Sequence, residues 1–113
     1  MTTLMIKESK VELYDDGYMM NREDWNPDVA SFLAKKEGIE LGDLHWDLIH
    51  FLRGYYEEFQ ISPNIKILVK HLKAVRGEDN IDTKVLYTLF PKGPSFQGCK
   101  IAGLPKPTNC IDG

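Results

Sequence analysis

The sequence predicts a mainly α-helical fold: a small orthogonal helical bundle with an N-terminal β-hairpin and a flexible C-terminal arm. Apolar residues recur at three- and four-residue steps through the middle of the chain, the spacing of one helix face. Polar residues followed by proline, a common start of a helix, precede two of these stretches. The last fifteen residues are rich in proline and hold both cysteines. At 113 residues we expect one domain, 1–113, with a body over 1–98 and an arm over 99–113.

The hairpin is expected near the N-terminus, around the turn residues Asp15-Asp16-Gly17. Two short β-prone runs, Val11–Tyr14 and Tyr18–Met20, flank this turn. An Asp-Gly pair between such runs is typical of a tight β-turn. The sequence therefore predicts strand pairing between these two runs.

The first two helices follow the hairpin. Asn26 caps the first helix, Pro27 occupies its first position, and Gly38 is a plausible stop. The second helix, over roughly 44–60, is the longest, with Asp43 as its cap. Its buried stripe is expected to consist of Trp46, Ile49, Leu52, Tyr56 and Phe59.

The third helix is predicted to start at Ser62-Pro63, by the same rule of a cap followed by proline. A polar loop over 76–80 follows, and Asp82 or Thr83 starts a short fourth helix that ends before Pro91. Residues 95–101 are expected to form one or two further helical turns, followed by extended chain after Gly103. The apolar faces of the third and fourth helices are expected to be Ile65, Leu68, Val69 and Leu72, and Val85, Leu86, Leu89 and Phe90.

Charge and hydropathy argue against several functional classes. The net charge is -3 and the sequence pI is about 5.6, whereas dedicated nucleic-acid binders usually carry a basic excess. No apolar run approaches the roughly 18 residues of a membrane span, and no secretory leader is visible. We therefore expect no membrane insertion and a cytoplasmic location, where thiols are mostly reduced.

The two cysteines, Cys99 and Cys110, are the strongest candidates for chemistry. Ten residues separate them, so an extended arm could carry Cys110 away from the body and back. Gly103 is a candidate pivot, and two prolines, Pro105 and Pro107, stiffen the chain that presents the terminal thiol. Two nearby cations, Lys100 and Lys106, favour thiolates, the reactive form of cysteine. The pattern indicates sulfur chemistry with a partner protein.

Other interpretations of the cysteines remain open at this point. They could be unreactive or form a single disulfide worth roughly 3 kcal/mol. A metal site that also uses His45, His50 and His71 lacks the usual ligand spacing. A hydrolase nucleophile three residues from the C-terminus would lack a preorganised pocket on its own chain.

A basic stripe runs along the third predicted helix. Lys66, Lys70 and Lys73 stand at i, i+4 and i+7, with Arg76 just beyond them. They form either a solvated helix face or a docking surface for an acidic partner, an anion or an RNA backbone. A helix-turn-helix DNA reader is a further possibility that the acidic total charge weakens. Arg53, in the second helix, is either a surface ion-pair partner or an anion contact.

Motifs along nearly the whole chain resemble the DsrC/TusE family of small sulfur carriers, which includes the gamma subunit of dissimilatory sulfite reductase. The two most specific motifs are the Leu-Phe-Pro-x-Gly-Pro block and the Ala-Gly-Leu-Pro-Lys-Pro arm. The matching stretches are Asp16-Gly17-Tyr18, Asp24-Trp25, Leu44-His45-Trp46-Asp47, Phe51-Leu52-Arg53, Tyr55-Tyr56, Ile61-Ser62-Pro63, residues 89–94, residues 99–108 and Cys110.

The resemblance implies a helical fold with an N-terminal hairpin, a helix-turn-helix-like element and a flexible arm. It implies that Cys110 accepts sulfur as a persulfide. Cys99 matches a second cysteine found in true DsrC proteins and typically absent from TusE. With both present, the family mechanism forms a disulfide or trisulfide, and the carrier is a co-substrate of dissimilatory sulfite reductase rather than a free-standing enzyme. The alternative is a TusE-like persulfide relay toward 2-thiouridine in tRNA, which needs only Cys110.

The same resemblance implies no cofactor of the chain's own, while the partner reductase would carry sirohaem and iron–sulfur clusters. The implied partners are dissimilatory sulfite reductase, a membrane-bound Dsr reductase complex, and sulfur-transfer proteins of the DsrEFH or TusBCD type. Nucleic acid is not an expected partner. The chain departs from the family pattern at the Ile111-Asp112-Gly113 extension, at Asn109 in place of a usual glycine, and at Gly54.

Overall fold

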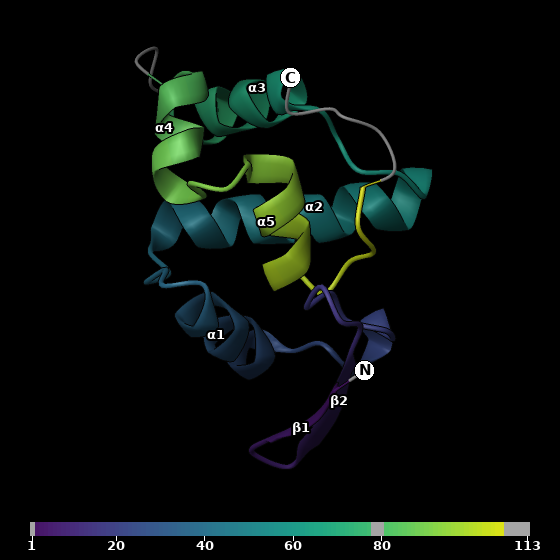
Figure 1. The fold of residues 1–113 in the computed structure, drawn as a ribbon. Coiled ribbons are helices and arrows are strands. Elements are labelled where there is room, and N and C mark those ends of the chain that lie inside the picture. Colours follow the sequence, from purple (N-terminus) through teal and green to yellow (C-terminus); the bar gives the residue numbers. More distant parts are fainter. Residues whose placement is uncertain (1, 78–80, 108–113) are drawn as a thin grey trace.

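The computed structural model describes residues 2–77 and 81–107, and it shows a helical body with a hairpin at one end (Figure 1). The principal extents are 41 × 26 × 23 Å. In chain order the elements are β1 (Thr2–Ile6), β2 (Ser9–Leu13), the 3-10 helix η1 (Arg22–Asp24), α1 (Pro27–Lys36), α2 (Asp43–Phe59), α3 (Ile65–Arg76), α4 (Thr83–Leu89) and α5 (Pro94–Ile101). The expected mainly helical fold with an N-terminal hairpin is confirmed.

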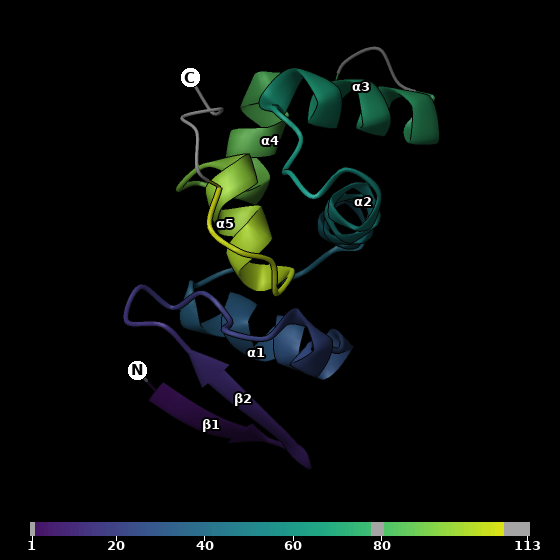
Figure 2. The same ribbon diagram turned by 90° about the vertical axis from the view of Figure 1, so that its right-hand side faces the viewer.

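Helix α5 occupies the centre of the molecule. It contacts α1, α2 and α4, whereas α3 packs on α2 and α4 at the end far from the hairpin (Figures 1 and 2). In Figure 1, α5 runs steeply across the long helix α2. Six of its eight residues are buried. The expected last helical turns over 95–101 are therefore a core element, and it carries Cys99.

The core follows the helical periodicity of the sequence, with two differences on α2. Ile49 and Leu52 are fully buried as expected, and so is Leu48. Phe59 lies in the last turn of α2 and is 51% exposed, so the buried stripe does not reach the end of the helix. On α3, the apolar face is confirmed, with Ile65, Leu68 and Leu72 buried.

The hairpin lies earlier in the chain than predicted. β1 and β2 pair in antiparallel register from Thr2 opposite Leu13 to Ile6 opposite Ser9, and Lys7 turns the chain with a positive φ of 55°. The segment around Asp15–Gly17 does form a turn, in which the Tyr14 amide donates to the Tyr18 carbonyl at 2.8 Å and the Gly17 amide donates to the Tyr14 carbonyl at 2.9 Å. Across that turn the two predicted runs do pair, through the antiparallel bridge between Leu13 and Met19 and the hydrogen bond from the Met20 amide to the Glu12 carbonyl at 2.9 Å, but they form no named strand within the described residues. A lysine at positive φ is uncommon, so the sequence held no cue for the true turn.

Two of the helix starts were assigned to the wrong residue. The α3 cap is Asn64, whose side chain accepts a hydrogen bond from the Ile67 amide at 3.0 Å, and not Ser62. Gly42, rather than Asp43, precedes α2. The predicted caps Asn26 and Asp82 are confirmed, since each side chain accepts a hydrogen bond from the amide three residues later. None of the helices in the described ranges is long and apolar enough to cross a membrane.

Candidate functional site

The first cysteine of the expected pair is a core residue. Cys99 lies in α5 with an exposed fraction of 0%. Its Sγ atom is 3.2 Å from the Ser62 hydroxyl oxygen, in the connection between α2 and α3. We expected the arm to start at residue 99, but in the structure the chain leaves the helix only after Ile101. A fully buried thiol is shielded from exchange with a partner, because thiol–disulfide exchange needs access.

The end of α5 is fixed by hydrogen bonds. The amide of Leu104 donates to the Cys99 carbonyl at 2.9 Å, and that of Gly103 donates to the Lys100 carbonyl at 3.4 Å. This pair is the Schellman arrangement that closes many helices, with Gly103 in the left-handed conformation at φ 74°. Leu104 is 1% exposed and packs into the core.

Gly103 is therefore a packed helix end in this structure. A Cβ atom there would lie 2.6 Å from Trp25 Cδ1 and 2.9 Å from Met19 Sδ. Both its φ and its close neighbours require glycine. The expected pivot is therefore packed against the body in this structure, and chain with no regular secondary structure begins at Leu104.

Arg53 and Trp25 hold the same helix end from outside. Arg53 donates from Nη1 to the Ala102 carbonyl at 2.7 Å, and Trp25 donates from Nε1 to the Ile101 carbonyl at 2.9 Å. The guanidinium stacks over the Trp25 ring at 4.2 Å from its centroid. These donors satisfy carbonyls that the helix leaves unpaired, and a cation at a helix C-terminus is favourable. Arg53 therefore serves the base of the arm, which neither sequence interpretation of this residue included.

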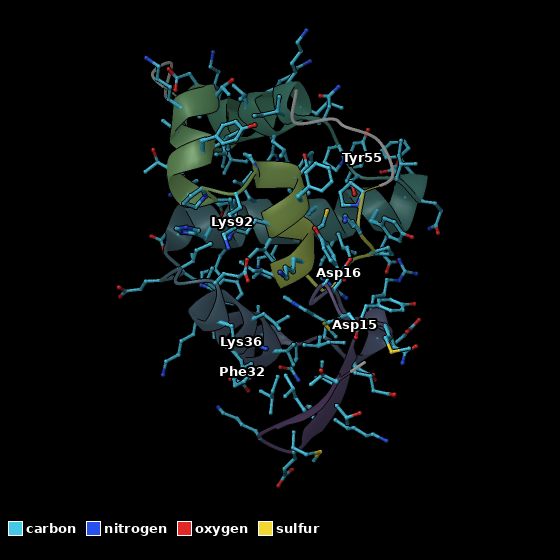
Figure 3. All side chains as sticks on the ribbon, viewed as in Figure 1. Asp15, Asp16, Phe32, Lys36, Tyr55 and Lys92 are labelled. Atoms are coloured by element: carbon cyan, nitrogen blue, oxygen red, sulfur yellow. The ribbon has the colours of Figure 1, made fainter. Side chains whose placement is uncertain are left out.

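The start of the arm lies beside the turn at Asp15–Gly17. Lys106 Nζ is 4.0 Å from an Asp16 carboxylate oxygen, and Figure 3 shows Asp15 and Asp16 beside the end of α5. Pro105 is exposed and Pro107 half-buried. Cys110 and the extension over 111–113 lie outside the described residues.

A polar cluster ties α5 to α1. Glu37, which ends α1, accepts from Gln97 Nε2 at 3.0 Å and pairs with Lys100 Nζ at 3.3 Å. Burial alone would raise the pKa of Glu37, but the hydrogen bond from Gln97 and the charge of Lys100 hold it below its ordinary value of 4.5. Lys100, expected to favour a thiolate, is therefore engaged by a carboxylate.

A groove of about 290 Å³ opens beside the base of the arm. The arm contributes Gly103 and Pro105 to its wall, and the opposite wall includes Arg22 and Tyr56. The Arg22 guanidinium lies 5.1 Å from the Tyr56 ring centroid and 3.5 Å from a Glu57 carboxylate oxygen. Arg22 therefore lines this groove with a cation that is already paired.

The basic stripe is separate from this region. Lys66, Lys70 and Lys73 are all exposed on α3, while the neighbouring Arg76 pairs with Asp47 at 2.6 Å. The structure brings Arg53 and Gly103 together at the end of α5, but it does not bring the lysines to them.

The three histidines do not converge on a metal site with Cys99. His45 uses both ring nitrogens, accepting from the Gly42 amide at 3.0 Å and contacting the Leu89 carbonyl at 2.9 Å. His71 stacks on Phe51 at 3.9 Å between centroids, and burial lowers its pKa. Over residues 2–77 and 81–107, no group of three or more potential ligands is close enough to hold a metal ion.

Three contributors to the site were missing from the sequence interpretation. The sequence predicts no site role for Trp25 or Glu37, and it predicts that Ser62 caps a helix. The contacts of Trp25 and Ser62 span 76 and 37 residues of sequence, so no local pattern reveals them. The family motifs do contain Trp25, Arg53 and Ser62 within the matching stretches, and that was the available indication.

Comparisons with known proteins agree on one family. Residues 5–111 match the family model described as "DsrC like protein". The chain is 45% identical over 111 residues to "Sulfurtransferase TusE" of Photorhabdus laumondii, covering 98% of this chain and all of that protein. It is 42% identical over 108 residues to "Sulfurtransferase TusE" of Escherichia coli K12, covering 96% and 99%.

Solved structures point to the same family. The oxidised gamma-subunit of the dissimilatory sulfite reductase (DsrC) from Archaeoglobus fulgidus is similar with a TM-score of 0.86 and 39% identity, over 97% of this chain and 100% of that one. The NMR structure of Allochromatium vinosum DsrC gives a TM-score of 0.84 and 44% identity, over 96% and 97%.

Proposed function

This chain belongs to the DsrC-like family of sulfur carriers, and from that premise we propose that it is a single-thiol persulfide carrier of the TusE type, with Cys110 as the sulfur-bearing residue. The observation that carries this proposal is the burial of Cys99, at 0% exposure inside α5. Because a partner cannot reach that thiol without opening the core, chemistry that needs only Cys110 suits this body best. The end-to-end similarity to proteins named sulfurtransferase TusE supports the same choice.

The chemistry is a transfer between thiols. The Cys110 thiolate attacks the outer sulfur of a donor persulfide, a new S–S bond forms on Cys110, and the donor leaves as its thiolate. A second transfer passes the outer sulfur to an acceptor and returns Cys110 to the thiolate. The body fixes the base of the arm through Arg53, Trp25 and Gly103, so that the terminal segment starts from a constant position.

The proposed setting is a cytoplasmic relay that ends in 2-thiouridine of tRNA. The partners would be persulfide proteins of the TusBCD or DsrEFH type, with no cofactor on this chain. Complementation tests the proposal: an E. coli strain lacking its own TusE receives wild-type protein, Cys99→Ala or Cys110→Ala, and tRNA 2-thiouridine is quantified by mass spectrometry. We expect the first two to restore it and Cys110→Ala to fail. Loss of restoration by a folded Cys99→Ala protein would rule out single-thiol transfer.

A second candidate function is favoured by the presence of Cys99 itself. Its spacing from Cys110 and the similarity to DsrC structures support a two-thiol carrier that serves dissimilatory sulfite reductase. Incubation with that reductase, sulfite and an electron donor for the reductase supplies two of the four electrons that sulfite must gain, and the two thiols supply the other two. Intact mass spectrometry should then show one sulfur bridging Cys99 and Cys110. A membrane-bound Dsr reductase complex would return the dithiol in that setting.

A further inference from the structure

The basic stripe, Lys66, Lys70 and Lys73 on α3, has no part in the persulfide chemistry proposed above. All three side chains are exposed. Within residues 2–77 and 81–107, none of the three ammonium groups has an ion pair or a hydrogen bond. Arg76 is different, because its Nη2 atom forms an ion pair with Asp47 Oδ2 at 2.6 Å. The stripe is thus a set of three unpaired cations on one helix.

The helix presents these cations together. At 100° and about 1.5 Å of rise per residue, positions 66, 70 and 73 fall within one narrow arc about 10 Å long. The orientation of α3 is fixed because Leu68 and Leu72 are fully buried against the body. Three charges therefore face solvent on one side of a helix that cannot rotate.

The stripe contrasts with the rest of the molecule. The three lysines are among 14 basic residues, and the other 11 stand against 17 acidic ones. The stripe is therefore a local cationic face on a chain whose remaining charged residues are acidic in balance. An asymmetry of this kind orients a protein as it approaches an oppositely charged surface.

We propose that the basic stripe docks a compact acidic face of a partner protein in the sulfur relay. A cluster of three or four carboxylates on a partner matches three cations along about 10 Å of helix. RNA fits less well, because a phosphate backbone would extend past the stripe onto the acidic remainder, and RNA-binding domains are usually basic overall. The proposal rests on the proposed function only for the role of the partner as sulfur donor or acceptor.

The segment that leads into α3 is joined to α5 by two side-chain contacts. α3 starts three residues after Ser62, which contacts Cys99, and the buried Ser95 hydroxyl donates to the Pro63 carbonyl at 3.2 Å. A partner held on α3 thus has a set relation to the base of the arm. The docking surface and the sulfur-bearing arm lie on one body but are chemically independent.

A binding experiment with two probes of equal charge tests the docking. A fluorescent oligoglutamate peptide stands for the acidic protein face, and an oligouridylate stands for RNA, both titrated with full-length protein at low salt. The test variant is Lys66→Gln/Lys70→Gln/Lys73→Gln. The matched control is Lys10→Gln/Lys35→Gln/Lys84→Gln, which removes three exposed lysines from β2, α1 and α4 and makes the same change in net charge.

We expect the test variant to bind oligoglutamate about tenfold more weakly than wild type. The loss of affinity in the control variant should be less than half of that tenfold loss. The difference should vanish in 1 M salt, where the Debye length is about 3 Å. Equal losses in the two variants would overturn the proposal, as would tighter, stripe-dependent binding of the oligouridylate. Cys110→Ser should bind oligoglutamate as tightly as wild type does. The binding assay therefore detects a failure of docking independently of a failure of persulfide transfer.

Discussion

At the scale of single residues, Gly103 determines how α5 ends. Replacing it with alanine places a Cβ 2.6 Å from Trp25 Cδ1 while φ stays near 74°. We expect Gly103→Ala to lower the free energy of unfolding by about 2–3 kcal/mol, from backbone strain and overpacking together. Urea unfolding followed by circular dichroism measures this change.

The control for that substitution is Gly54→Ala. Gly54 lies within α2, where an added Cβ would have no neighbour within 4 Å. Alanine there should raise the free energy of unfolding by about 0.5–1 kcal/mol through helix propensity. If the two alanine substitutions changed the free energy of unfolding in the same direction and by the same amount, the close packing described around Gly103 would be wrong.

Arg53 makes a second prediction at this scale. Lysine retains the charge but loses the planar group that stacks on Trp25 and donates to the Ala102 carbonyl. We expect Arg53→Lys to lower the free energy of unfolding by about 1–2 kcal/mol in the same urea assay. Arg76→Lys, at the surface pair with Asp47, should change it by less than about 0.5 kcal/mol. If Arg76→Lys lowered the free energy of unfolding more than Arg53→Lys does, the contacts of Arg53 would not be the more important ones.

These residues show where sequence reasoning reaches its limit. The glycine at 103 was noticed for its freedom, yet its neighbours Trp25 and Met19 come from far away in the chain. Arg53 was recognised as a site residue, but its partner Ala102 is 49 positions distant. Sequence patterns identify the residue types that a site uses, while the contacts that define their roles arise only when helices pack.

At the scale of elements, the tie between α1 and α5 predicts a pH dependence. The pKa of Glu37 is lowered in the folded state, against its burial, by Gln97 and Lys100. A carboxylate with a lowered folded pKa stabilises the fold above its unfolded value, near 4.5, and this stabilisation is lost as pH falls through the folded value.

Glu37→Gln should therefore unfold more easily than wild type at pH 7. The gap between the two proteins should narrow as pH falls below about 4.5, because wild-type Glu37 becomes neutral as well. Free energies of unfolding from urea titrations between pH 3 and pH 7 provide the measurement. A gap that stays constant with pH would mean that the charge of Glu37 does not tie the helices together.

Elements were predicted best where periodicity and caps agreed. α1 starts at Pro27 behind Asn26, and α4 starts behind Asp82, as their sequences indicate. α3 starts later than predicted because Asn64 provides the capping oxygen, while Ser62 turns inward to Cys99. The hairpin was misplaced because its turn uses Lys7 at positive φ in place of a typical turn pair.

At the scale of the whole molecule, the structure places Cys99 in the body, whereas the sequence places it at the start of the C-terminal arm. Cys99 was expected on the arm, but it belongs to the core helix that α1, α2 and α4 surround. Family resemblance did predict the fold. It did not predict burial, which depends on how the helices around α5 pack. The choice between one-thiol and two-thiol chemistry therefore becomes a question of how often the core opens.

That question yields the last prediction, for the Cys110→Ser protein, in which Cys99 is the remaining thiol. Because Cys99 is 0% exposed, a thiol reagent can label it only when the groups packed around its sulfur move away. We expect labelling to be at least about 1,000-fold slower in native buffer than in urea, and to accelerate with denaturant as global unfolding does. Native labelling within a few-fold of the unfolded rate would show that Cys99 becomes accessible readily in the folded protein. Fast labelling would therefore support the two-thiol reaction. Slow labelling would support the reaction in which Cys110 alone carries the sulfur.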